Sequence, residues 1–223
     1  MKRTRESLKL LFEKAYTDFH TQRERNRDPV QFSSRYQNPQ DQEVVAFLSA
    51  LLSYGSVSQI LSSVEKALLP LGPSPADFIK TSPLSELWNG FHHRFTQGVD
   101  IEMIGHFLKE ILISHGSIES CFVDCPSKKL EDRLSFFVNR FWEASFTSSF
   151  KAVLKKRQRN LKYLLSDPKR GSACKRLNLF LRWVVRPADG IDLGIWSKVH
   201  PQDLILPVDT HILKILRALR WTS

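Results

Sequence analysis

Long apolar stretches are missing from this sequence. No segment approaches the roughly 20 apolar residues that a membrane-spanning helix needs, which argues against a membrane protein. The N-terminus is basic, but Lys9 and Glu13 break the apolar run behind it, as in an amphipathic helix and unlike a signal peptide. We therefore expect a cytoplasmic protein without a membrane partner.

Cysteine is scarce as well. The three cysteines, Cys121, Cys125 and Cys174, cannot all pair with one another, and no second pair completes the spacing of a zinc or iron–sulfur site. We predict buried or inert thiols in a reducing compartment. We expect neither a metal nor another cofactor.

Strand-like alternation is the third absence. Apolar residues recur instead at helical spacing along nearly the whole chain, which predicts an all-α fold. Asn38 before Pro39 is a typical helix start, and the serine–proline pairs at 74–75 and 82–83 predict the starts of two further short helices. Internal repeats and low-complexity linkers are also absent, so we expect a single helical domain over residues 1–223.

Positive charge is what the chain has in excess. Its 33 Lys and Arg residues against 23 Asp and Glu residues give a net charge of +10 and a pI of about 9.7. Such a domain favours polyanions, because binding to phosphates releases counterions. The alternative is a lysine-rich surface without a partner. Residues 151–176 are the most basic part and are expected to face solvent or phosphate, with a short helix at 161–165.

A glycine-bearing turn at residues 167–175 is the first candidate site. A helix is expected to end before it and another to begin after it, so that backbone N–H groups are exposed at a helix N-terminus. With the neighbouring Lys and Arg side chains, these amides suit a phosphate. An ordinary helix–helix connection with a serine cap explains the turn equally well.

Lys175 and Arg176 follow this turn. A lysine in the first turn of a helix lies where the dipole disfavours its positive charge, and the neighbouring cation acts in the same direction. Both effects make a neutral, nucleophilic amine more accessible, and such amines attack C1′ of a deoxyribose to form a Schiff base. The alternative is a solvated or phosphate-binding lysine.

Asp209 lies just after Pro207, at the expected start of the last helix. Aspartate is a common N-cap, which explains the residue without chemistry. A carboxylate at this position is also suited to stabilise an oxocarbenium ion at C1′ or to organise a nucleophile. His211 is a candidate phosphate donor or a structural histidine.

Two tryptophans are candidates for stacking on a flipped base, Trp183 and Trp196. The alternative for this region is a packed helix whose arginines pair with Asp189 or Asp192. We favour such an ion pair for Arg182.

Three short motifs, in order along the chain, resemble the helix-hairpin-helix DNA glycosylase superfamily, which includes endonuclease III and 8-oxoguanine glycosylases. Residues 47–55, FLSALLSYG, are similar to its early L-L-S-x-Q helix end. Residues 171–175 have the G-x-x-x-K spacing of its hairpin with the catalytic lysine. Residues 208–211 read V-D-T-H, as in the motif that holds its catalytic aspartate.

A closer resemblance, over nearly the whole chain, is to an uncharacterised bacterial family known as domain of unknown function 2400. It rests on the following motifs: Asn38-Pro39-x-Asp41, Tyr54-Gly55, Arg94-Phe95, the run at 175–183, and residues 207–211.

The glycosylase resemblance implies an all-α, helix-hairpin-helix DNA glycosylase-like fold in which two helical lobes flank a cleft. We expect a central lobe at about 38–145 and a lobe with the hairpin and the aspartate at about 150–223, joined by the N-terminal helix. The implied protein is a monomer that binds damaged DNA, flips out a base and cleaves its N-glycosidic bond. The alternative is a non-catalytic DNA- or RNA-binding protein of the same fold.

The resemblance also implies roles for individual residues. Lys175 would attack C1′ and Asp209 would stabilise the sugar cation. DNA binding would fall to Lys169, Arg170, Gly171, Ser172, Ala173, Cys174, Arg176 and His211.

The sequence departs from the superfamily at several positions. Ala173 replaces the second hairpin glycine, and Gly55 replaces the glutamine that fills the gap left by a flipped base. Residues 187–206 look like an insertion, and the cluster-binding cysteines are missing. Because the chain stops soon after Asp209, we expect a final helical segment of the relatives to be missing.

Overall fold

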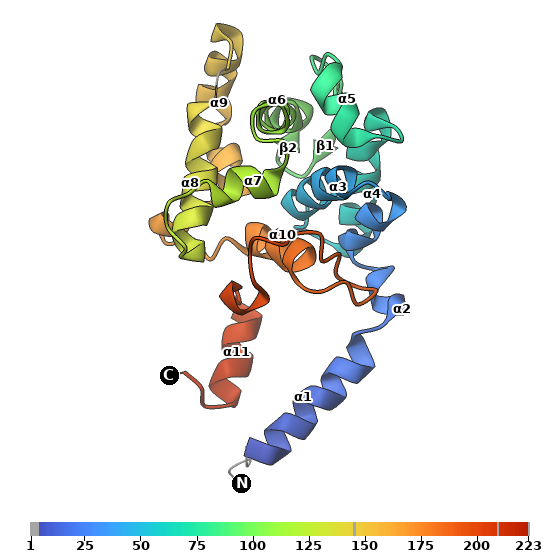
Figure 1. Cartoon of the computed structure of the whole chain (residues 1–223), viewed down its shortest axis with the longest axis vertical. Coiled ribbons are helices and arrows are strands. Elements are labelled where there is room, and N and C mark those ends of the chain that lie inside the picture. The colour runs from blue at the N-terminus through green and yellow to red at the C-terminus, as the bar shows by residue number, and fades with distance from the viewer. Residues whose placement is uncertain (1–4, 145, 209, 223) are drawn as a thin grey trace.

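Helices make up most of the computed structural model, which describes residues 5–144, 146–208 and 210–222, and the all-α prediction is confirmed (Figure 1). In this part of the chain, extended structure is confined to the antiparallel pair β1 (His92–His93) and β2 (Thr96–Gln97). The helices, with 3-10 helices labelled η, are α1 (Arg5–Phe19), α2 (Gln22–Arg25), η1 (Pro29–Arg35), α3 (Pro39–Leu51), α4 (Val57–Leu68), η2 (Leu69–Leu71), α5 (Pro75–Thr81), α6 (Gly98–Ser114), α7 (Ile118–Val123), α8 (Leu130–Glu143), α9 (Ser148–Leu164), η3 (Pro168–Arg170), α10 (Lys175–Val185), η4 (Pro201–Asp203) and α11 (Thr210–Ala218).

The central helix of the fold is α3, which packs against η1, α5 and α10. It begins as the sequence predicts, because the Asn38 side chain accepts the Gln40 N–H at 2.9 Å and Pro39 occupies the first turn. Nearly all its later residues are buried, and Phe47 meets the ring edges of Phe137 and Phe180. Burial of each such large apolar side chain contributes roughly 1.5–3 kcal/mol.

The predicted helix start at 82–83 is wrong, because residues 82–91 form turns that carry Trp88 into the core. The Trp88 indole N–H donates to the Ala67 carbonyl at 2.8 Å. A Cβ on Gly98 would lie 1.9 Å from the Trp88 carbonyl oxygen, so only glycine fits where α6 begins. These tertiary contacts override the local serine–proline signal.

Glu43 is a buried carboxylate that joins three segments. It accepts the backbone N–H groups of Ile118 and Glu119, each at 2.8 Å, at the start of α7. It also accepts the Trp196 indole N–H at 2.6 Å. Burial raises the pKa of Glu43 to about 7, because these hydrogen bonds offset only part of the cost of burying a charge.

Glu43 should therefore make stability depend on pH. Its folded-state pKa lies above the ordinary value of 4.5, so the folded protein binds more protons between these two values. The free energy of unfolding should fall by roughly 3 kcal/mol as the pH rises through this window and then level off. Urea titrations between pH 4.5 and 8 should show a shallower fall for Glu43→Gln; equal slopes would contradict this assignment.

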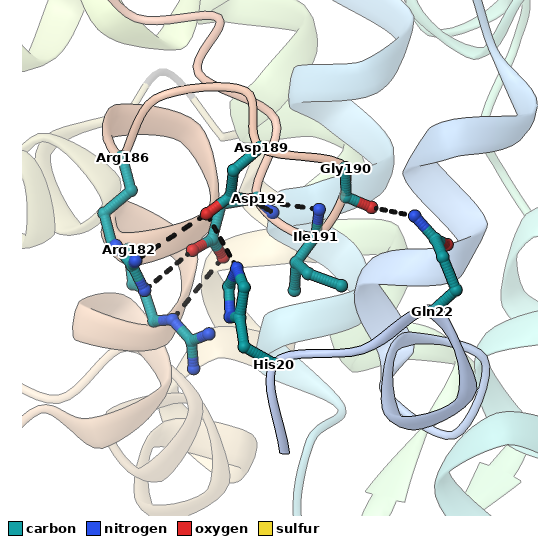
Figure 2. Close-up of polar contacts among 8 residues, drawn as sticks. All are labelled: His20, Gln22, Arg182, Arg186, Asp189, Gly190, Ile191 and Asp192. Atoms are coloured by element: carbon teal, nitrogen blue, oxygen red, sulfur yellow. Dashed lines mark hydrogen bonds and ion pairs between the residues drawn. The ribbon is translucent and has the colours of Figure 1, made fainter. Parts of the chain in front are cut away.

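The loop at 187–192 attaches to the N-terminal part of the chain (Figure 2). The His20 imidazole lies 2.8 Å from the Asp189 carboxylate, and the Gln22 amide donates to the Gly190 carbonyl at 2.8 Å. Although burial raises it, backbone N–H donors and His20 lower the pKa of Asp189 to about 2. These contacts anchor the segment that follows α10.

Asp192 is the buried partner of two arginines, Arg182 on α10 and Arg186 directly after that helix. Its carboxylate lies 3.4 Å from Arg182 and 3.0 Å from Arg186, so the ion pair predicted for Arg182 is confirmed (Figure 2). Burial raises the pKa of Asp192, while the two guanidinium groups lower it in part. Both Arg182 and Arg186 are thereby committed to holding the loop against α10.

One hydrophobic cluster runs through both expected lobes, from Val30 to Val199. The division into lobes stays a prediction. Helices α1 and α11 project from the same end of the molecule, where Phe12 meets Trp221 with ring centroids 5.7 Å apart (Figure 1). Among the described residues, no helix is long and apolar enough to span a membrane.

Candidate functional site

The turn between α9 and α10 is built by local capping. Asp167 accepts the Lys169 N–H at 3.0 Å at the start of η3. The residue after η3, Gly171, lies in the left-handed region with φ of 76°. Cys174 is also left-handed, with φ of 45°, and its thiol donates to the Ser166 carbonyl at 3.1 Å. Helix α10 then begins at Lys175, as the sequence predicts.

The loss of stability on substituting Gly171 should depend on how well the new residue tolerates a left-handed backbone and not on the size of its side chain. A Cβ built there meets nothing within 4 Å, so the left-handed conformation is the only obstacle. Gly171→Val should cost roughly 1–2 kcal/mol, and Gly171→Asn should cost less because asparagine tolerates this region. Chemical denaturation of the two variants checks this; equal losses would contradict it.

A cavity of about 770 Å³ opens at the N-terminus of α10. It lies between the end of α3, one face of α8, the end of α9 and the turn. Its volume falls within the range of small-molecule sites. The cavity brings together Lys175 and Arg176 with Ser53 and Tyr54, which come from opposite parts of the sequence. Its charged lining consists of Lys162, Asp167, Arg170, Lys175 and Arg176.

Arg176 stacks on tyrosines in this cavity. Its guanidinium lies 3.8 Å from the ring centroid of Tyr163 and 5.4 Å from that of Tyr54, and it donates to the Tyr163 carbonyl. Burial lowers the pKa of Arg176, and the neighbouring tyrosines act in the opposite direction. The cation and the rings therefore fix one another's positions.

A second cavity, of about 440 Å³, lies on the other side of the turn. Its lining includes residues 171–174 and residues 205–208, the segment directly before Asp209. Asn178 stabilises this region, because its amide donates to the Ala173 and Cys174 carbonyls. The turn thus separates the segment leading to Asp209 from the larger cavity.

The structure brings most predicted DNA-binding residues together around the turn. Arg170 and Arg176 line the larger cavity, Gly171 the smaller, and Ser172, Ala173 and Cys174 both. Lys169 points to α8, with its amine 3.1 Å from the Asp132 carboxylate. His211 is exposed in the first turn of α11. Asp209 lies outside the described residues.

The structure does not place Trp183 and Trp196 in a base pocket. Trp183 is 1% exposed in the core, and Trp196 is buried with its indole N–H bound to Glu43. Neither residue lines either cavity. Both side chains are therefore part of the hydrophobic core.

Three cavity aromatics were not predicted: Tyr54, Trp142 and Tyr163. Tyr54 is part of the motif at 47–55, but a motif at a helix end does not predict which residues its last side chains contact in the folded protein. Tyr163 follows a lysine-rich stretch, and aromatics among basic residues are a usable signal for nucleic-acid binding.

The thiols are not arranged for chemistry. All three cysteines are buried and free, which confirms the prediction of buried thiols. Burial raises the pKa of Cys121 to about 11 and also raises that of Cys174. Across the described residues, no group of three or more His, Cys, Asp and Glu side chains could hold a metal ion.

Comparison with protein families assigns the chain to one family. The family model described as "Protein of unknown function (DUF2400)" matches residues 28–223. The chain belongs to this family. No curated protein and no solved structure matches it. The similarity to DNA glycosylases stays a prediction from the motifs.

Proposed function

We propose that this protein is a DNA-repair glycosylase-like enzyme that binds damaged DNA and cleaves the N-glycosidic bond of a flipped base. One observation carries the proposal: Lys175 lines a cationic, partly aromatic cavity at the start of α10, together with Ser53 and Tyr54, which follow α3. The cavity has the volume for a base and its sugar, and an amine at its wall is suited to reach C1′.

The proposed chemistry needs an amine nucleophile and a carboxylate. The Lys175 amine attacks C1′ as the bond from C1′ to the base nitrogen breaks, and the base leaves with the bonding electrons and takes up a proton. Loss of the amine proton and opening of the sugar ring give a Schiff base, which water hydrolyses. Asp209 would stabilise the positive charge on the sugar. Residues 205–208, directly before Asp209, line the smaller cavity together with the turn, so the support for this role is the V-D-T-H motif at 208–211.

Phosphate contacts would come from the turn and from α9. The exposed side of α9 carries Lys151, Lys155, Lys156 and Arg159. Cations on one helix beside the cavity suit a phosphate backbone, and such binding weakens steeply as salt rises. This arrangement agrees with the basic composition of the chain.

Base release from oligonucleotides with different lesions tests the proposal. The wild type should release at least one modified base, and Asp209→Asn should release it far more slowly. Salt-dependent binding without release on any lesion, unaffected by Asp209→Asn, would instead establish a non-catalytic nucleic-acid-binding protein. Competition between DNA and RNA duplexes then separates a DNA partner from an RNA partner.

A further inference from the structure

Three aromatic rings from distant segments meet beside the larger cavity. The rings of Tyr54 and Phe95 are stacked, with centroids 5.0 Å apart and an interplanar angle of 20°. Tyr163 meets both rings edge-on, with centroids 5.4 Å from Tyr54 and 4.7 Å from Phe95. We name Tyr54, Phe95 and Tyr163 the aromatic platform.

The platform is held in place by hydrogen bonds that involve α9 and the β1–β2 hairpin. The Phe95 carbonyl, at the tip of the β1–β2 hairpin, accepts hydrogen bonds from Arg157 at 2.9 Å and Asn160 at 3.0 Å, both on α9. The Tyr54 hydroxyl donates to Thr96 Oγ1 at 2.6 Å. Because these contacts fix the hairpin tip, the rings are positioned before any ligand binds.

Two rings of the platform are open to solvent. Phe95 is 37% exposed and Tyr163 is 44% exposed. Arg176 covers part of Tyr163, and Lys162 lies 5.8 Å from the Trp142 ring centroid at the cavity wall. Exposed aromatic rings beside clustered cations are the combination that binds unpaired nucleotides, with the rings on bases and the cations on phosphates.

We propose that the aromatic platform stacks on unpaired bases, so that the preferred substrate of this site is a single-stranded or locally unpaired nucleic acid. The inference rests on the proposed function, because it names the substrate class for the same cavity. Base faces are covered by their neighbours in a duplex, and only an unpaired base can offer its face to these rings. The cavity admits one or two nucleotides rather than a duplex, since its volume is that of a small-molecule site.

Binding measurements on the full chain test this inference without relying on chemistry. Fluorescence anisotropy should compare a labelled single strand with its duplex at one salt concentration, for the wild type, Tyr163→Leu and Phe95→Leu. The wild type should bind the single strand more tightly. Each variant should lose about 5- to 100-fold of single-strand affinity with little change for the duplex. Tyr16→Leu is the matched control, because Tyr16 is 54% exposed on α1, outside the cavity lining.

The outcomes separate the two proposals. Duplex binding as tight as single-strand binding would contradict the proposal that the platform stacks on unpaired bases. Platform variants with unchanged affinity for both nucleic acids would also contradict it. If a thermal melt shows that a variant is not folded, the comparison of single-strand and duplex binding by the wild type decides the question. Tighter binding to the single strand without base release would contradict the proposed enzyme but would support the proposed role of the platform. Base release from a duplex, without tighter binding to the single strand, would support the proposed enzyme and contradict the proposed role of the platform.

Discussion

Replacing Lys175 by methionine should abolish covalent trapping of the protein on damaged DNA. If the Lys175 amine forms the Schiff base, borohydride reduces that imine to a stable amine link, and methionine cannot form it. We expect the yield of trapped complex to fall by more than about 100-fold. Gel separation of the borohydride-treated complex, on a lesion that the wild type processes, measures this.

Lys14→Met is the control for this experiment, because Lys14 is an exposed lysine on α1, outside both cavities. It should trap as well as the wild type. Trapping of Lys175→Met at the wild-type level would show that another amine, or none, is the nucleophile. Anisotropy on the same DNA should show that Lys175→Met still binds.

Replacing Arg157 by methionine should cause the largest loss of stability. Asp100 is fully buried at the start of α6, and Arg157 on α9 binds both of its carboxylate oxygens. Removing the guanidinium leaves a buried charge that keeps its hydrogen bond from the Gln97 N–H but loses its cationic partner. We expect a loss of roughly 3–5 kcal/mol, and therefore a melting temperature lower by roughly 6–20 °C.

Lys156→Met is the matched control, because Lys156 is the exposed neighbour of Arg157 on α9. It should leave the melting temperature within a few degrees of the wild type. A double variant, Arg157→Met with Asp100→Asn, should recover part of the loss because the buried charge is removed as well. Equal melting temperatures for Arg157→Met and Lys156→Met would contradict this account of the ion pair.

The helices could be predicted largely from local signals. The start of α3 follows from Asn38 and Pro39, and the start of α10 from the glycine turn before it. Helix α9 was expected only at 161–165, yet it begins at Ser148. Its early part consists largely of exposed lysines with little apolar periodicity. Because an amphipathic helix is predicted from a repeating apolar face, this part was missed.

The candidate site could be predicted only where its residues are contiguous. Residues 169–176 form one turn and one helix start, so their grouping follows from sequence. The aromatic platform depends on the β1–β2 hairpin bringing Phe95 to Tyr54 and Tyr163, and no local pattern encodes that contact. Trp183 was a plausible base-stacking residue by type, but its burial is decided by the packing of α10 on α3.

Mapping the residue that carries the sugar after borohydride trapping tests the proposed function most directly. Wild-type protein would be reduced on a lesion-bearing oligonucleotide, digested with protease, and analysed by mass spectrometry. We predict that the added mass lies on Lys175. Base release with the adduct on another lysine, or no adduct and no release on any lesion, would contradict the assignment of this cavity as the site of Schiff-base chemistry.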